Sequence, residues 1–84
     1  MMEVRLTAYA AKQFVRLPKL VRDRLRRRLE LLNDEPMAGK KLHGQLEGFR
    51  SLRAWPYRIL YFIDRQHLIL WVHSIEHRQS VYKR

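Results

Sequence analysis

The first part of the chain changes its hydrophobic pattern from period two to the period of a helix. Residues 2–6 alternate between apolar and charged side chains, which predicts a short strand. Thr7 is a suitable N-cap, and the helix that follows it is predicted to run to about residue 17. Pro18 ends this helix and can serve as the first residue of a second one, which is predicted to end at about residue 33. A strand followed by a two-helix hairpin is therefore expected.

The second helix combines one apolar stripe with many arginines. Spacings of four, four and three residues place its apolar side chains on one face, namely Val21, Leu25, Leu29 and Leu32. Its arginines fall mainly on the other faces, namely Arg22, Arg24, Arg26, Arg27 and Arg28. They fit a solvated helix exterior, a direct substrate contact, or a docking surface for an acidic or amphipathic partner. Pro36 and Gly39 mark the turn that follows.

From residue 46 onward the apolar positions recur every second residue. Strands are predicted over residues 46–53, 57–63 and 68–75, and the last one is apolar on both faces, which predicts a central position. The order of elements indicates an α+β fold, with an N-terminal strand, a two-helix hairpin and a three-strand antiparallel meander. The helices are expected on one sheet face. The length of 84 residues predicts a single domain over residues 1–84.

Charge is the strongest signal in the composition. Eighteen Lys and Arg against eight Asp and Glu give a net charge of +10, and thirteen of the eighteen cations are Arg. Such a small basic body attracts polyanions, with nucleic acid the first candidate and an anionic membrane surface the second. The absence of cysteine excludes disulfides and a cysteine nucleophile. Because no long apolar run or secretion signal is present, we expect a cytoplasmic protein with no membrane partner.

Cations, an imidazole and a phenol recur along the predicted meander. These candidate site residues are Arg50, Arg53, Arg58, His77, Arg78 and Tyr82. Because strands of a meander are neighbours, the side chains are expected to converge on one concave face. Arginines around a phosphate stabilise a pentacoordinate transition state without a metal, and a histidine can carry the proton. Taken singly, Arg58 also fits a strand surface, His77 a turn, and Tyr82 a packing role.

Other classes of site lack the residues that they need. His73 and His77 have the spacing of a helical metal pair, but they lie in a predicted strand and just after it. The three glycines do not form a phosphate-binding loop, and the scattered carboxylates do not form a two-metal nuclease site. We therefore expect neither a metal nor another cofactor.

Three motifs in sequence order resemble one known family. Lys-Leu-His-Gly-Gln-Leu-Glu-Gly-Phe-Arg spans residues 41–50, Tyr-Arg-Ile-Leu-Tyr spans residues 57–61, and His-Arg-Gln-Ser-Val-Tyr spans residues 77–82. With the preceding helix that ends in Leu-Pro and the arginine-rich helix after it, they resemble the RelE/ParE toxin superfamily of bacterial toxin–antitoxin systems. The resemblance covers about residues 2–84.

This resemblance implies a RelE-like fold, similar to that of small microbial ribonucleases, and a toxin held inactive by a cognate antitoxin. RelE-type members are metal-independent endoribonucleases, or mRNA interferases. They enter the A site of the 30S ribosomal subunit and cleave mRNA, which inhibits translation. The 2′-hydroxyl of the substrate attacks the adjacent phosphate and leaves a 2′,3′-cyclic phosphate and a 5′-hydroxyl. A toxin with this activity is the main expectation.

The resemblance also implies roles for basic residues. Arg58 matches the arginine that stabilises the transition state in the family. Arg50 and Arg53 match basic residues that hold phosphate and lower the pKa of the 2′-hydroxyl. Lys41 and His43 lie in the first motif and are expected to bind RNA.

The C-terminal motif is expected to complete the site. His77 or Arg78 matches the catalytic position at this end of the family pattern, and Tyr82 matches a tyrosine that stacks on or orients the nucleotide. The best-known member has lysines where this chain has arginines, and arginine does not act as a base. The general base therefore stays open, with His43 and Glu47 as candidates.

Two other hypotheses fit the positive charge of the chain. A ParE-type toxin poisons DNA gyrase and cleaves nothing itself, so it has no need of the His-Arg and Tyr ending. A plain RNA-binding module would bind with an affinity that falls steeply with salt, without turnover.

Overall fold

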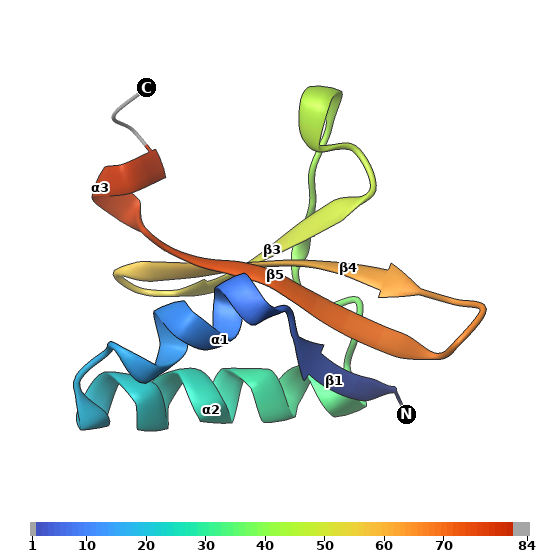
Figure 1. The fold of residues 1–84 in the computed structure, drawn as a ribbon. Coiled ribbons are helices and arrows are strands. Elements are labelled where there is room, and N and C mark those ends of the chain that lie inside the picture. The colour runs from blue at the N-terminus through green and yellow to red at the C-terminus, as the bar shows by residue number, and fades with distance from the viewer. Residues whose placement is uncertain (1, 82–84) are drawn as a thin grey trace.

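The computed structural model describes residues 2–81, in which two helices cover one face of a twisted sheet (Figure 1). The elements in chain order are β1 (Glu3–Leu6), α1 (Ala8–Val15), α2 (Lys19–Asp34), β2 (Lys40–Lys41), the 3₁₀ helix η1 (Gly44–Leu46), β3 (Phe49–Ala54), β4 (Tyr57–Asp64), β5 (Ile69–His77) and α3 (Arg78–Val81). The predicted α+β class and the position of both helices on one face are confirmed. None of the described helices is long and apolar enough to span a membrane.

The sheet has five strands in the order β1-β5-β4-β3-β2. As predicted, β3, β4 and β5 form an antiparallel meander, and β5 lies inside the sheet between β1 and β4. β1 pairs with β5 in parallel, through residues 3–6 and 69–72. The alternation of residues 2–6 predicts this strand but not its partner. The first and last strands of the chain are therefore neighbours (Figure 1).

The core lies between the helices and the sheet face that they cover. Three leucines of the predicted α2 stripe, Leu25, Leu29 and Leu32, are buried there. They belong to one cluster with side chains from the sheet, namely Leu52, Ala54, Ile59, Tyr61, Leu70, Val72 and Ile75. Burying an aliphatic side chain of this size contributes about 1.5–3 kcal/mol. The stripe therefore determines which face of α2 meets the sheet.

Thr7 caps α1 as predicted and also ties the helix to β5. Its Oγ1 accepts a hydrogen bond from the Ala10 amide at 3.1 Å and donates one to the His73 carbonyl at 2.9 Å. The Thr7 amide donates to the Val72 carbonyl at 3.0 Å. One short side chain thus fixes the helix start against the middle of β5.

Two features before β4 differ from the prediction. Residues 44–46 form η1 and β3 begins only at Phe49, so the strand predicted over 46–53 starts three residues too early. Gly48 separates the two elements with a φ of 96°, a left-handed conformation that a regular strand does not contain. The two-residue strand β2, which pairs with residues 50 and 51, is too short to show a period in the sequence.

β5 contains a β-bulge at His73. Leu60 of β4 pairs with Ser74, whereas the next residue, Tyr61, pairs with Val72, so His73 has no partner on β4. A bulge shifts by one residue the alternation of side chains beyond it. It therefore decides which residues at the end of β5 face the helices and which face away.

The C-terminal end differs from the prediction as well. β5 continues two residues past the predicted end and includes His77, and α3 follows at once. The Arg78 amide donates to the Pro56 carbonyl at 2.8 Å, which attaches the start of α3 to the β3–β4 turn. Tyr82 lies outside the described residues.

Candidate active site

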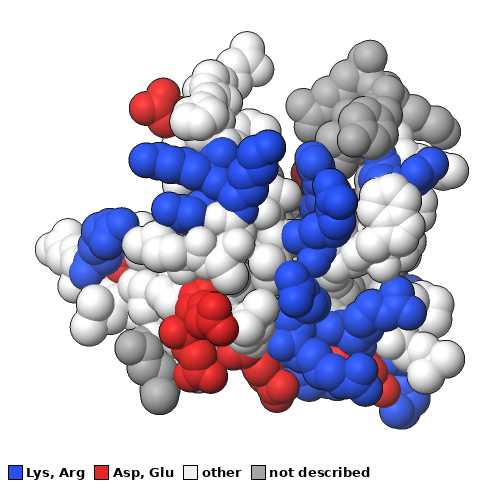
Figure 2. All heavy atoms as spheres, turned by 180° about the vertical axis from the view of Figure 1, so that it is seen from behind, with Lys and Arg blue, Asp and Glu red and all other residues white. Residues whose placement is uncertain are grey.

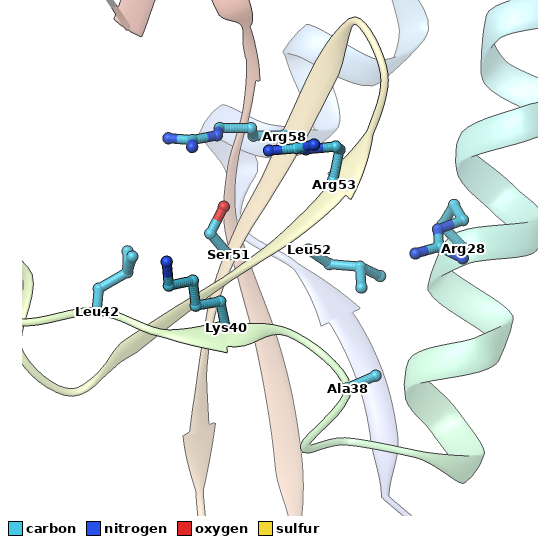
Figure 3. A pocket seen from close by; sticks show the side chains of 8 residues that line it. All are labelled: Arg28, Ala38, Lys40, Leu42, Ser51, Leu52, Arg53 and Arg58. Atoms are coloured by element: carbon cyan, nitrogen blue, oxygen red, sulfur yellow. The ribbon is translucent and has the colours of Figure 1, made fainter.

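A hollow of about 450 Å³ lies along β2 and β3, and α2 borders it (Figure 3). It is lined by Arg28, Ala38, Lys40, Leu42, Ser51, Leu52, Arg53 and Arg58. The strand register brings the polar members together, because Arg53 pairs with Arg58 and Lys40 pairs with Ser51. Paired residues project to the same side of a sheet. Two guanidinium groups and an ammonium group therefore share one hollow.

Within residues 2–81 the cations of this hollow form no salt bridge with a carboxylate. Arg53 and Arg58 extend next to each other from neighbouring strands (Figure 3). Within residues 2–81 the Arg58 guanidinium forms no hydrogen bond or salt bridge, and the salt bridges in this part of the chain lie elsewhere. Arg28 Nε is buried without a hydrogen-bond partner among the same residues. Unpaired donors and like charges on adjacent strands are costly, and a bound anion such as phosphate relieves both.

A second hollow, of about 250 Å³, adjoins the first at Arg58. It is lined by Leu42, Leu46, Ser51, Arg58, Leu60, His73 and Glu76. Glu76 pairs with Arg58 across β4 and β5, and its Oε2 accepts a hydrogen bond from Ser74 Oγ at 3.3 Å. The His73 ring lies edge-on to Phe49 with 5.4 Å between centroids. Arg58 therefore lies between a basic hollow and a hollow that holds an imidazole and a carboxylate.

His77 lies on the opposite face of the sheet from Arg58. It pairs with Tyr57, and the two rings meet edge to face at 5.1 Å in a hollow that α1 borders. The Gln79 amide donates to His77 Nδ1 at 3.1 Å, so in the neutral ring the proton is on Nε2. The expected convergence of His77 with Arg58 is wrong, because the bulge at His73 shifts the alternation and Glu76 takes the position opposite Arg58.

Arg50 and Lys41 also point away from Arg58. Arg50 Nη1 donates to the Gly39 carbonyl at 2.8 Å and to the Met37 carbonyl at 3.3 Å, so its guanidinium holds the turn before β2. Lys41 pairs with Arg50 and lines a separate hollow with it. The expected convergence on one face is wrong for Arg50. Of the two adjacent lysines, the structure places Lys40 in the hollow of Arg58.

The other candidates lie at the margins. His43 and Glu47 flank η1 and are exposed, and neither lines a hollow with Arg58. Arg78 lies at the β3–β4 turn, with its Cζ 4.9 Å from the centroid of the Trp55 ring. The catalytic and RNA-binding roles of all these residues stay predictions. The site predicted from the sequence did not include Lys40, His73 or Glu76, and the two-residue strand that carries Lys40 shows no alternation.

Positive charge extends well beyond the two hollows. Figure 2 shows Lys and Arg side chains (blue) in a nearly continuous band down one half of the view. Asp and Glu side chains (red) gather mainly at the lower middle of the view. A band of this kind supplies a long-range field that attracts a polyanion and orients it before any specific contact forms.

Comparison with known proteins identifies the family of this chain. The sequence matches the family described as the ParE toxin of type II toxin–antitoxin system, parDE, over residues 4–82. The chain belongs to this toxin family. Toxin RelE of Mycobacterium tuberculosis is 34% identical over 82 residues, which cover 95% of this toxin and 84% of that protein. Toxin RelG of the same organism is 39% identical over 54 residues, which cover 63% of this toxin and 62% of RelG. The predicted RelE/ParE superfamily is therefore confirmed.

Solved structures agree with this assignment. A chain in the toxin–antitoxin complex RelBE2 of Mycobacterium tuberculosis is 32% identical to this toxin, with a TM-score of 0.84, and the match covers 92% of this toxin and 98% of that chain. A chain in the intact RelBE toxin–antitoxin complex of E. coli is 23% identical, with a TM-score of 0.77, and the match covers 92% and 96% of the two chains. The second likeness shows the fold alone. The RelE-like fold predicted from the sequence is confirmed.

In this toxin a buried tyrosine holds the turn that carries β2. The Tyr61 hydroxyl donates to the Pro36 carbonyl and accepts from the Gly39 amide, both at 2.8 Å. Arg50 binds the Gly39 carbonyl from the other side. These bonds fix the turn and therefore the position of Lys40 in the hollow.

We expect Tyr61→Phe to lower the free energy of unfolding by about 1–3 kcal/mol at neutral pH, because two polar groups lose their partner. Burial raises the pKa of the Tyr61 hydroxyl above its usual value of 10.0. Because this pKa is higher in the folded state, the contribution of the hydroxyl to stability is fully present below the pKa of the unfolded state. It is lost as the pH rises through the pKa of the folded state. The difference in the free energy of unfolding between wild type and Tyr61→Phe should therefore become smaller above pH 10. Urea unfolding over a pH series measures this difference. A constant difference would contradict this assignment.

Gly39→Ala tests the same turn from the other side. An added Cβ would lie 2.5 Å from Tyr61 Oη and 2.6 Å from Cε1, so the turn or the ring has to move. We expect a loss of about 1–3 kcal/mol in the free energy of unfolding, as for other overpacked sites. Gly44→Ala is the control, since its Cβ meets nothing within 4 Å and only its φ of 71° is unfavourable. Thermal unfolding of both variants measures the effect, and a Gly39→Ala variant as stable as the wild type would contradict the close contact with Tyr61.

Proposed function

We propose that this toxin is a ribosome-dependent, metal-independent mRNA endoribonuclease that cleaves in the A site and so inhibits translation. The proposal rests on the position of Arg58, which lines both hollows of the open sheet face. Its guanidinium has no hydrogen-bond or salt-bridge partner within residues 2–81. Relatives named toxin RelE and toxin RelG support it, as does the resemblance to RelE-type nucleases. The partners are then mRNA and the A site of the 30S subunit.

The residues of the first hollow suit transfer of the phosphate to the 2′-oxygen. In this reaction the 2′-O–P bond forms and the P–O5′ bond breaks, which leaves a 2′,3′-cyclic phosphate and a 5′-hydroxyl. Negative charge grows on the non-bridging oxygens of the pentacoordinate phosphorus. The Arg58 guanidinium donates hydrogen bonds to these oxygens, and Arg53 and Lys40 hold the same phosphate or its neighbour.

In this proposal His73 accepts the proton of the 2′-hydroxyl. His73 lines a hollow with Arg58, whereas His77 lies across the sheet. A neutral imidazole accepts the proton of the 2′-hydroxyl as the 2′-O–P bond forms, and the leaving 5′-oxygen takes a proton from water. The hydroxide that this leaves takes the proton of the imidazolium, which restores the neutral ring. The Glu76 carboxylate lines the same hollow and stabilises the imidazolium that results.

A cognate antitoxin and a cytoplasmic location complete the proposal. The similar chain of known structure at 32% identity belongs to a toxin–antitoxin complex. An acidic or amphipathic antitoxin segment would complement the net charge of +10. A cytoplasmic location follows from the proposed target, because translating ribosomes and mRNA are in the cytoplasm.

The deciding experiment adds purified toxin to a translating ribosome complex and maps the mRNA by primer extension. Cleavage within the A-site codon, absent on naked RNA, is the expected result. The family description names ParE, which makes a DNA gyrase poison the second candidate. Intact mRNA with uninhibited translation, together with trapped gyrase–DNA breaks, would overturn the nuclease in favour of that candidate.

A further inference from the structure

An exposed tryptophan lies at the β3–β4 turn among arginines from three elements. Trp55 is 55% exposed. The Cζ atoms of Arg78 and Arg53 lie 4.9 and 5.9 Å from its ring centroid, and Arg24 Nη1 of α2 donates to its carbonyl at 3.0 Å. The turn thus presents one large aromatic side chain inside a cationic ring of side chains.

This cluster has the two components of a single-strand nucleic-acid site. Within residues 2–81, none of Arg24, Arg53 and Arg78 forms a salt bridge with a carboxylate. Phosphates of a single strand supply the missing anions, and its bases supply flat faces that stack on indole or guanidinium groups. A lone exposed tryptophan needs no explanation, but one with three guanidinium groups near it, none of them in a salt bridge within residues 2–81, does.

Arg53 connects this cluster to the basic hollow. Its guanidinium lines the hollow with Arg58 and also contacts the Trp55 ring. We propose that Trp55, with Arg53 and Arg78, is a stacking platform for a base of single-stranded RNA that leaves the hollow of Arg58. The inference rests on the proposed function and adds a binding subsite to it. An acidic peptide would use the charge but not the aromatic face, so RNA is the ligand that the cluster fits best.

The test measures binding of a short 2′-O-methyl RNA, which cannot be cleaved, by fluorescence anisotropy at about 0.15 M salt. We expect Trp55→Leu to weaken binding about tenfold and Trp55→Phe to retain most of the affinity, because base–aromatic stacking contributes on that scale. Trp71→Leu is the matched control, since Trp71 lies beside Arg5 near the β1 edge of the sheet. Circular dichroism checks that each variant is folded.

Inorganic polyphosphate separates stacking from charge, because it has phosphates but no bases. We expect Trp55→Leu to bind it as the wild type does, whereas Arg53→Ala should weaken the binding of both ligands. Equal RNA affinity for Trp55→Leu and wild type would overturn the platform, and so would Trp55-dependent binding of polyglutamate but not of RNA. Because the RNA is not cleavable, these outcomes do not depend on turnover. A platform without A-site cleavage would remove the proposed nuclease function and leave the RNA subsite.

Discussion

Arg58→Ala should lower the rate of A-site cleavage by about 10²- to 10³-fold, the loss typical of removing one donor to a developing oxyanion. Arg58 has no partner within residues 2–81 to lose, so the fold should keep its stability within about 0.5 kcal/mol. Single-turnover cleavage on ribosome complexes measures the first quantity, and urea unfolding measures the second. Toxicity in cells should disappear at equal expression.

Two further variants show what Arg58 supplies. Arg58→Lys keeps the charge but loses the planar fork, so we expect it to recover only part of the rate. Arg5→Ala removes the same charge from the β1 edge, where Arg5 pairs with Glu3, and should cleave as the wild type does. If Arg58→Ala cleaves at the wild-type rate, Arg58 does not stabilise the transition state and the proposed site is wrong.

His73→Gln is expected to reduce cleavage by about 10²- to 10⁴-fold, the usual contribution of a general base. The pH dependence of the remaining rate should change shape, because glutamine cannot take up the proton that an imidazole accepts. A merely structural role would lower the rate without changing the shape of this profile. Rates on ribosome complexes between about pH 5.5 and pH 8 measure both effects.

The choice between two histidines is settled by parallel variants. His67→Gln, at the β4–β5 turn beside Asp64, is the control and should leave the profile unchanged. His77→Gln tests the residue that the family pattern favours. A normal profile in His73→Gln together with a flat profile in His77→Gln would assign the proton to His77. In that case substrate would have to reach the sheet face that α1 borders.

The long periodic segments of this toxin are the parts that its sequence predicts well. The Leu25 stripe of α2 and the alternation of residues 57–63 each repeat over several residues, and each buries enough apolar area to decide the local structure. The same regularity places Arg53 and Arg58 on one side of neighbouring strands, as the register confirms. Their chemical roles rest on resemblance and on the unpaired charge, which only the structure reveals.

The errors come from single residues that interrupt a period. Alternation along β5 from Val72 would put His77 on the open face, but the one-residue bulge at His73 moves it to the helix face. This bulge leaves no apolar signature, since its extra residue, His73, is polar and exposed. Lys40 was missed for a related reason, because a strand of two residues has no period to detect. The sequence shows that a histidine or a lysine is present, but only the strand register shows which face of the sheet it lies on.

The parallel pairing of β1 with β5 also fixes when the toxin can finish folding. Residues 3–6 are made well before their hydrogen-bond partners, residues 69–72. Closing the loop between β1 and β5 costs conformational entropy, which is offset only when the sheet forms. We therefore expect β1 to stay unpaired until β5 has been made. The hairpin with Arg53 and Arg58 can form earlier, but His73 and Glu76 arrive with β5. A growing chain therefore carries Arg53 and Arg58 before it carries His73, so the two proposed parts of the site are present together only after β5 has been made.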